Sequence, residues 1–232
     1  MDNIKGLIWD MDGTLLNTLD DIVGAVNATL CQWGLEEKTK AELLGFIGYG
    51  VRHLCAGATG FEGDQLTRFL SEYRQMAIDR NDPETTIYPG IVEILEKSRK
   101  NGIKLGIYTN KPQKWCTKLA EKFFGAGVFD RIIGTTEGGI LKPDPAGIVQ
   151  MCKAWNVQPN EVVMIGDSPV DWETSVNAHC QGICVSWGFR TRTVLRLRGQ
   201  TGLWMTQRNF GEKQELKSPM PRHLRFKPER DR

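Results

Sequence analysis

The stretch at residues 5–14, K-G-L-I-W-D-M-D-G-T, determines how the rest of the chain is interpreted. Leu7, Ile8 and Trp9 form a short apolar run, which is typical of a strand buried on both faces. The run ends at two carboxylates, Asp10 and Asp12. Such carboxylates repel each other and are costly to bury while ionised, so a buried pair needs a compensating cation. The stretch therefore indicates either a divalent-metal site or, in the simpler alternative, two solvated turn acids.

The composition is that of a globular protein. The chain has 232 residues, 40% of them apolar, and a formal net charge of +2. No run approaches the roughly 18 apolar residues needed to span a bilayer, and no apolar leader precedes the first strand, so we expect a cytoplasmic protein. Six cysteines occur without a C-x-x-C pair or zinc-ligand spacing, and we expect them to be reduced thiols.

Helical periodicity dominates the chain from residue 16 to residue 82. Apolar residues recur at helical spacing over 15–33, and further helical segments at 40–46, 50–55 and 64–79 are separated by glycine-containing breaks. We expect no strand between residues 16 and 82. This part of the chain is predicted to be a small helical bundle.

Strands and helices alternate after a turn at residues 81–83. The expected strands lie at 103–109, 131–134, 162–165 and 182–185, and the expected helices at 91–101, 113–123, 145–155 and 170–178. Such alternation requires crossover connections and predicts a mostly parallel sheet covered on both faces. The pattern thus predicts an α/β fold in which a helical bundle lies between the first strand and the later strands, and ligands of such sheets bind at the carboxyl ends of the strands.

The residues at these strand ends form a set suited to phosphoryl transfer. Asp10 is a candidate nucleophile, and Asp12 a candidate for protonating the leaving oxygen and then activating water. Thr109 and Lys142 can contact the phosphoryl oxygens. Asp167, together with the Asp10 carboxylate and the Asp12 carbonyl, supplies the oxygen ligands that Mg²⁺ prefers.

Each signal has a simpler interpretation when taken alone. Thr109 and Asn110 can cap the following helix, Lys142 can be a solvated loop residue, and residues 166–168 can be a turn that caps a helix. Their order at successive strand ends favours the joint interpretation.

Four motifs in the same order resemble those of the haloacid dehalogenase-like superfamily. They are D-M-D-G-T at 10–14, Y-T-N at 108–110, L-K-P-D-P at 141–145 and G-D-S-P-V-D at 166–171. The resemblance covers residues 4–189 and implies a Rossmann-like core at 1–15 and 83–189 with a helical cap at 16–82. Within the superfamily, the second Asp of the first motif distinguishes phosphatases and phosphomutases from carbon–halogen hydrolases.

The resemblance also assigns roles to residues. It implies that Asp10 is the nucleophile, Asp12 the acid/base and Asp167 a magnesium ligand. Thr109 and Lys142, with Gly13 and Asn110, are the implied phosphate contacts, and Ser168 and Asp171 are supporting residues. Asp171 is expected to hold Lys142 or a metal-bound water.

The stretches around these motifs look most like phosphoglycolate phosphatases, which act on a small phosphorylated metabolite through an aspartyl phosphate. A phosphosugar mutase shares all four motifs and remains the alternative, and a non-catalytic binding protein on this fold is a further one. The chain departs from the usual family pattern at Tyr49, where Asn is common, and at His179, where Gly is common.

The last segment, 190–232, differs from the rest in composition. It carries 12 Lys and Arg but only 4 Asp and Glu, and it has little periodicity. A basic arm that binds nucleic acid is one interpretation, but no known module is recognisable, so we expect no nucleic-acid partner. The other interpretations are a disordered or poorly packed tail and a change of reading frame near residues 191–201.

Overall fold

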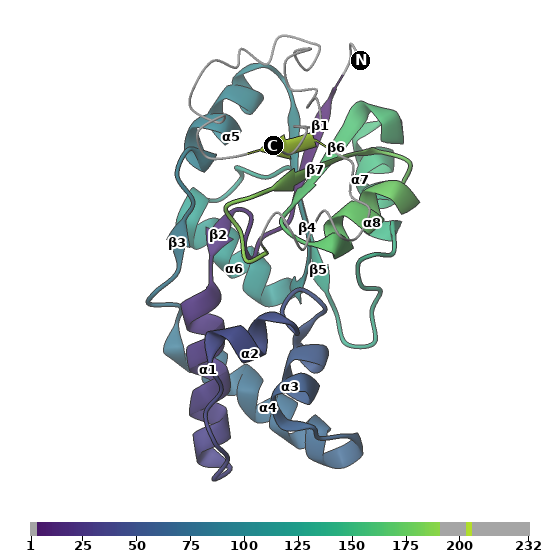
Figure 1. Ribbon diagram of the computed structural model, residues 1–232. Coiled ribbons are helices and arrows are strands. Elements are labelled where there is room, and N and C mark those ends of the chain that lie inside the picture. The colour runs from purple at the N-terminus through teal and green to yellow at the C-terminus, as the bar shows by residue number, and fades with distance from the viewer. Residues whose placement is uncertain (1–3, 191–202, 206–232) are drawn as a thin grey trace, which may run out of the picture.

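The computed structural model describes residues 4–190 and 203–205. Its core is a parallel sheet with the strand order β5-β4-β1-β6-β7-β8 (Figure 1). The strands are β1 (Gly6–Trp9), β4 (Lys104–Pro112), β5 (Arg131–Thr135), β6 (Val162–Gly166), β7 (Gln181–Val185) and β8 (Leu203–Met205). β1 lies between β4 and β6 and is buried along its whole length. The predicted Rossmann-like α/β fold is confirmed.

Helices cover both faces of the sheet. α5 (Ile91–Lys100) and α6 (Gln113–Phe124) cover one face, and α7 (Ala146–Trp155) and α8 (Pro169–Asn177) cover the other; a short 3₁₀ turn, η1 (Pro159–Glu161), precedes β6. The side chains of β1 alternate accordingly, because Leu7 and Trp9 pack toward α5 and α6 whereas Ile8 packs toward α7. This explains why the strand that carries the first motif is apolar throughout.

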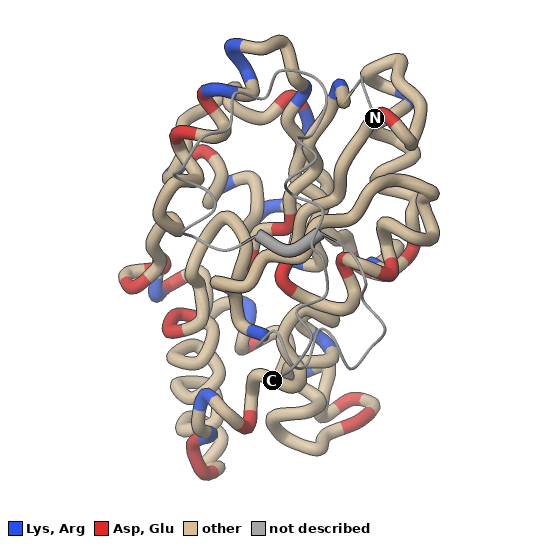
Figure 2. The backbone as a smooth tube through the Cα atoms, turned by 45° about the horizontal axis from the view of Figure 1, so that its top comes forward, with Lys and Arg blue, Asp and Glu red and all other residues tan. Residues whose placement is uncertain are grey.

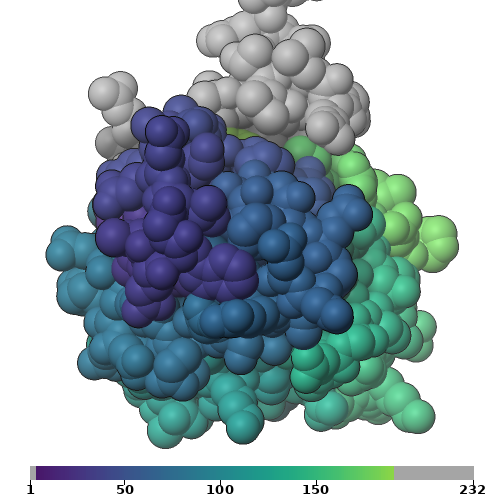
Figure 3. Space-filling view, turned by 90° about the horizontal axis from the view of Figure 1, so that it is seen from below, coloured from purple at the N-terminus to yellow at the C-terminus, as the bar shows by residue number. Residues whose placement is uncertain are grey.

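A second hydrophobic core lies in the helices between the first and later core strands. These are α1 (Leu19–Gln32), α2 (Lys40–Leu44), α3 (Val51–Thr59) and α4 (Gly63–Arg80), which we call the helical insert. Phe69, Val26 and Leu43 are fully buried in its core. The insert lies beyond the carboxyl ends of the sheet strands (Figure 1). Figure 3 shows the molecule from that side, where the residues of the insert lie against those of the sheet domain.

Two short strands connect the sheet domain to the insert. β2 (Leu16–Asn17) pairs in antiparallel fashion with β3 (Thr86–Ile87). The prediction that residues 16–82 contain no strand is therefore wrong at Leu16 and Asn17, and the first helix begins at Leu19 instead of residue 15. Two residues are too few to show the alternation that identifies a strand, so the sequence carried no usable signal here.

Part of the predicted basic tail is described. The backbone of Leu203–Met205 pairs in parallel with β7 and adds a sixth strand to the sheet. The predictions for residues 191–202 and 206–232 lie outside the described residues.

Within the described part of the chain, Lys and Arg positions are interspersed with Asp and Glu positions (Figure 2). No helix of this part is long and apolar enough to cross a membrane.

Candidate active site

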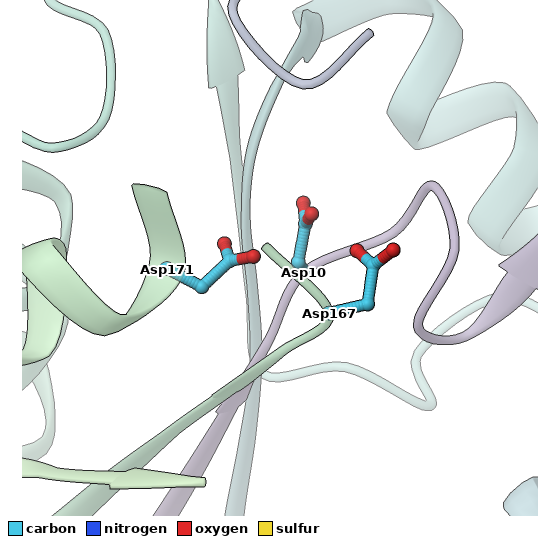
Figure 4. A group of neighbouring side chains, drawn as sticks. All are labelled: Asp10, Asp167 and Asp171. Carbon is cyan, nitrogen blue, oxygen red and sulfur yellow. The ribbon is translucent and has the colours of Figure 1, made fainter. Parts of the chain in front are cut away.

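Three carboxylates converge at the carboxyl ends of β1 and β6. Asp10 directly follows β1, Asp167 directly follows β6, and Asp171 lies in the first turn of α8. Each offers an oxygen within 4.8 Å of the others, and all three side chains are buried (Figure 4). The structure thus brings together Asp10 and Asp167, which are far apart in the sequence, as the strand-end argument predicted.

Lys142 neutralises part of this negative charge. It comes from the loop after β5, and its Nζ lies 2.8 Å from Asp10 Oδ1 and 2.5 Å from Asp171 Oδ1. The expected support of Lys142 by Asp171 is therefore present as an ion pair. Burial lowers the pKa of Lys142, but the Asp10 and Asp171 carboxylates outweigh burial and raise it overall, so the side chain is a permanent cation.

The acid cluster still carries excess negative charge. Burial, together with repulsion from Asp171, raises the pKa of Asp10 to about 6 and that of Asp167 to about 7. The Arg190 charge acts in the opposite direction on Asp167 but does not cancel these effects. Buried carboxylates that face too few cations form a donor set that suits a divalent cation with a preference for oxygen ligands.

The oxygens of Asp171 are already engaged. Oδ2 accepts hydrogen bonds from Ser168 N at 3.0 Å and Ser168 Oγ at 2.6 Å, and Oδ1 faces Lys142. Ser168 and Asp171 form a capping box at the start of α8, which fixes both side chains. Asp10 and Asp167 are therefore the better carboxylate ligands for a metal, and Asp171 is placed to orient Lys142.

The Asp12 carboxylate has partners outside the acid cluster. Its carboxylate accepts a hydrogen bond from Thr18 Oγ1 at 2.7 Å, and its two oxygens lie 2.9 and 3.3 Å from Lys111 Nζ. The Asp12 carboxylate is thus engaged by Thr18 and Lys111, and the metal contact of the Asp12 carbonyl stays a prediction. Burial lowers the pKa of Lys111, but the Asp12 carboxylate outweighs burial and raises it overall.

Lys111 is a site residue that the sequence analysis did not identify. It lies in β4 two residues after Thr109, and alternate residues of a strand face the same side. That spacing was the available signal. Thr109 is buried, and its Oγ1 accepts a hydrogen bond from the Lys111 backbone N–H at 3.3 Å.

Asn110 holds loops together through its side-chain amide. Its Oδ1 accepts from Lys142 N at 2.7 Å, and its Nδ2 donates to Lys142 O at 3.1 Å and to Gly48 O at 2.9 Å. The predicted contact between Asn110 and phosphate stays a prediction.

Gly13 has a steric role in the turn after β1. Its φ is +82°, and a Cβ at this position would lie 2.5 Å from Asp167 Oδ2. Only glycine therefore allows Asp167 to approach the first-motif turn. The Gly13 N–H donates to Leu16 O at 2.9 Å, and a phosphate contact at Gly13 stays a prediction.

A cavity of about 40 Å³ lies between the strand ends and the insert. Polar residues of the sheet domain and mostly apolar residues of the insert line it: Asp10, Asp12, Thr109, Asn110, Lys111 and Trp115 on one side, and Ile22, Ile47, Gly48, Gly50, Val51, Leu54 and Tyr73 on the other. Tyr49 does not line this cavity, and its ring packs 5.1 Å from the ring of His53. The insert thus closes the site mainly with aliphatic side chains and glycine backbone.

A larger cavity of about 230 Å³ adjoins the first between α1, α4 and α6. The two share Ile22, Tyr73, Lys111 and Trp115 in their walls. Lys111 therefore lies where the two cavities meet.

Comparisons with known proteins show which family the chain belongs to. The family model of haloacid dehalogenase-like hydrolases matches residues 7–185. A phosphoglycolate phosphatase from Cereibacter sphaeroides is 35% identical over 200 residues, which cover 84% of this chain and 90% of the relative. Another, from Psychrobacter arcticus, is 30% identical over 192 residues, covering 79% of this chain and 84% of the relative.

A solved structure shows the same fold. The crystal structure of a candidate phosphoglycolate phosphatase from Lactobacillus delbrueckii subsp. bulgaricus superposes with a TM-score of 0.81 at 28% identity, covering 88% of this chain and 95% of that one. The match to the family model spans all four motifs and the insert between them. The chain therefore belongs to the haloacid dehalogenase-like hydrolase family.

Proposed function

We propose that this protein is a Mg²⁺-dependent phosphatase that hydrolyses a small phosphorylated metabolite, with phosphoglycolate as the preferred substrate, through an aspartyl-phosphate intermediate. One observation carries the proposal: the buried Asp10 carboxylate, paired with Lys142, lies in the same acid cluster as Asp167 and lines a small cavity between the strand ends and the insert. A nucleophile, a phosphate-binding cation and a metal ligand thus meet at one point.

The proposed reaction has two steps. An Asp10 carboxylate oxygen attacks phosphorus, the ester P–O bond breaks, and Asp12 donates a proton to the leaving oxygen, which releases glycolate. Water then attacks the phosphorus of the aspartyl phosphate, Asp12 takes a proton from this water, and the P–O bond to Asp10 breaks. Inorganic phosphate leaves, and both aspartates return to their starting states.

The charge that develops on the phosphoryl oxygens is met by residues already in place. Lys142 provides a buried ammonium next to Asp10, and Thr109 lines the cavity that Asp10 also lines. We propose that the Asp10 and Asp167 carboxylates and the Asp12 carbonyl hold Mg²⁺, which when bound neutralises phosphoryl charge. Asp171 keeps Lys142 oriented.

The cavity supports a small substrate with a second negative charge. The cavity is small, about 40 Å³, which favours a short leaving group over a bulky one. Lys111 is in its wall, and we propose that its ammonium faces the carboxylate of phosphoglycolate. The names of the relatives at 30% and 35% identity point to the same substrate.

The phosphosugar mutase alternative fits this cavity less well. A mutase has to hold a sugar through hydroxyl groups and return the phosphoryl group to it. The insert side of the cavity offers mostly aliphatic side chains such as Ile47, Val51 and Leu54, which cannot hydrogen-bond to hydroxyls, and Tyr73 is the one lining residue there with a polar side chain. A non-catalytic binding protein is disfavoured because every charged position that the chemistry needs is filled.

A panel of phosphate esters tests the proposal. We expect phosphate release with Mg²⁺ and none after the metal is chelated, and a higher kcat/KM for phosphoglycolate than for hexose phosphates. Formation of an isomeric sugar phosphate without phosphate release would instead identify a mutase, and inactivity toward the whole panel with Mg²⁺ present would contradict the proposal. A cytoplasmic location stays a prediction.

A further inference from the structure

The loop between α2 and α3 of the insert is hydrogen-bonded to the sheet domain at two consecutive carbonyls. Asn110 Nδ2 donates to Gly48 O at 2.9 Å, and Arg190 Nη2 donates to Ile47 O. Ile47 and Gly48 both line the small cavity above Asp10. The two donors therefore act on the part of the insert that closes the site.

The first donor is linked to the catalytic lysine. The same amide group of Asn110 bonds both the N–H and the C=O of Lys142, at 2.7 and 3.1 Å. Asn110 is 5% exposed and is thus held in a fixed position. A shift of the insert loop would leave its Nδ2–H with one acceptor fewer in a buried environment, which is unfavourable.

The second donor is linked to the metal-binding carboxylate. The segment that ends at Arg190 lies against Asp167, because Phe189 N donates to Asp167 Oδ2 at 2.6 Å. The Phe189 side chain packs against the hydrophobic core of the insert. The segment also reaches the first-motif turn, because Trp187 Nε1 donates to Thr14 O at 3.1 Å.

Both donors thus connect the insert loop to one part of the catalytic machinery, Lys142 in one case and Asp167 in the other. The loop backbone is suited to such a contact, because Gly48 has a φ of +95° and Gly50 a φ of +90°. These conformations favour glycine and allow the backbone, without a side chain, to lie against the sheet domain.

We propose that Asn110 and Arg190 form a latch that holds the insert closed over the phosphoryl site by donating to the Gly48 and Ile47 carbonyls. Both act as positioning residues. Closure then depends on Lys142 and Asp167 being correctly placed, because each donor is fixed next to one of them. The kinetic part of the test below rests on the proposed phosphatase function, whereas the exchange part does not.

Hydrogen–deuterium exchange on the full chain tests the latch directly. In Arg190→Met, which keeps much of the side-chain length but has no donor, the amides of residues 45–51 should exchange about tenfold faster, as expected for the loss of one charge-assisted hydrogen bond. Amides within α1 should be unchanged. Arg190→Lys keeps a donor and should restore at least part of the protection.

Two further variants complete the exchange test. Asn110→Asp keeps an oxygen to accept from Lys142 N but loses the Nδ2 donor to both Gly48 O and Lys142 O, and it should also speed exchange at residues 45–51. Arg52→Met is the matched control, because Arg52 is an exposed arginine of α3 close to the loop. It should leave exchange at 45–51 unchanged.

Kinetics should separate two substrates. With phosphoglycolate, Arg190→Met should raise KM about tenfold and change kcat little, because the binding-competent closed state becomes less populated. With p-nitrophenyl phosphate, whose aryl leaving group is larger than glycolate and is better accommodated when the insert opens, kcat/KM should stay equal or rise. Simple structural damage would lower activity toward both.

Unchanged exchange at residues 45–51 in both Arg190→Met and Asn110→Asp would overturn the latch. So would equal losses for the two esters in Arg190→Met. If Arg190→Met does not fold, Arg190→Lys and Asn110→Asp decide by their exchange alone. If the wild-type protein hydrolyses neither ester, the proposed function fails, and the exchange result still decides the latch.

Discussion

Lys111 Nζ lies 2.9 Å from Asp12 Oδ1, so the candidate acid/base is paired with a buried ammonium in the wall of the active-site cavity. The pair joins the end of β4 to the turn after β1. A substrate with a second anion can share the Lys111 ammonium with Asp12, whereas a neutral leaving group cannot. This arrangement makes Lys111 the residue best placed to select an anionic leaving group.

Lys111→Met should therefore lower kcat/KM for phosphoglycolate roughly 30- to 150-fold, because a buried charge pair and the substrate contact are both lost. This corresponds to a loss of about 2–3 kcal/mol of transition-state stabilisation. The loss should be smaller for ethyl phosphate, which has no carboxylate. Lys114→Met is the control, since Lys114 is an exposed lysine of α6 and lines only the adjoining cavity. Equal losses for both esters would show that Lys111 does not recognise the carboxylate.

Asp10→Asn should abolish turnover and leave the fold intact, because the amide has nearly the same shape but is a poor nucleophile. We expect kcat to fall roughly 10⁴-fold or more, as for other nucleophile replacements. Far-UV circular dichroism and thermal unfolding check the fold. Asp79→Asn, on an exposed part of α4, is the control and should keep full activity. Near-normal turnover in Asp10→Asn would remove Asp10 as the nucleophile.

The strand-end residues were predictable because a parallel sheet places the carboxyl ends of its strands at one edge. Asp10 and Asp167 follow strands with clear apolar patterns, and their convergence in the structure follows from that topology. The contact between Asp171 and Lys142 is one of the two supporting roles expected of Asp171. The apolar pattern and the sheet topology are therefore sufficient to predict the site residues that come from the sheet domain.

The remaining contacts depend on how the insert packs against the sheet domain. The sequence does not encode this packing as a periodicity. The Lys111–Asp12 pair, the Asn110 bond to Gly48 and the Arg190 bond to Ile47 each join segments whose relative position is set only in three dimensions. The two-residue strands β2 and β3 escaped prediction for the same reason, because each is defined by its partner.

The metal-free protein should lose stability as the pH rises. Burial raises the pKa of Asp10 to about 6 and that of Asp167 to about 7, above the value of about 3.9 in an unfolded chain. Stability from these groups is therefore complete below about pH 4 and is lost as the pH rises through 6 and 7. For Asp10 alone the loss amounts to roughly 3 kcal/mol, since a tenfold change in a protonation constant is worth about 1.4 kcal/mol.

Thermal unfolding with EDTA at pH 5 and pH 8 measures this loss. The fall in Tm from pH 5 to pH 8 should be smaller in Asp167→Asn, which lacks one of the two acids, and smaller in the wild type when Mg²⁺ replaces EDTA. An equal fall in Tm for the wild type in EDTA, the wild type in Mg²⁺ and Asp167→Asn would contradict the prediction that ionisation of the buried acid cluster destabilises the folded protein.

Gly13→Ala should impair metal binding and activity more than it impairs folding. The positive φ of Gly13 imposes about 1–2 kcal/mol of backbone strain on alanine, and the new Cβ would also lie 2.5 Å from Asp167 Oδ2 and displace that carboxylate. Gly34→Ala is a matched control, because Gly34 also has a positive φ, +67°, but a Cβ there meets no atom within 4 Å. Both variants should lose similar stability from strain. Only Gly13→Ala should require a much higher Mg²⁺ concentration for half-maximal activity. If Gly13→Ala and Gly34→Ala reach half-maximal activity at the same Mg²⁺ concentration, displacing the Asp167 carboxylate does not weaken metal binding, and the assignment of Asp167 as a metal ligand fails.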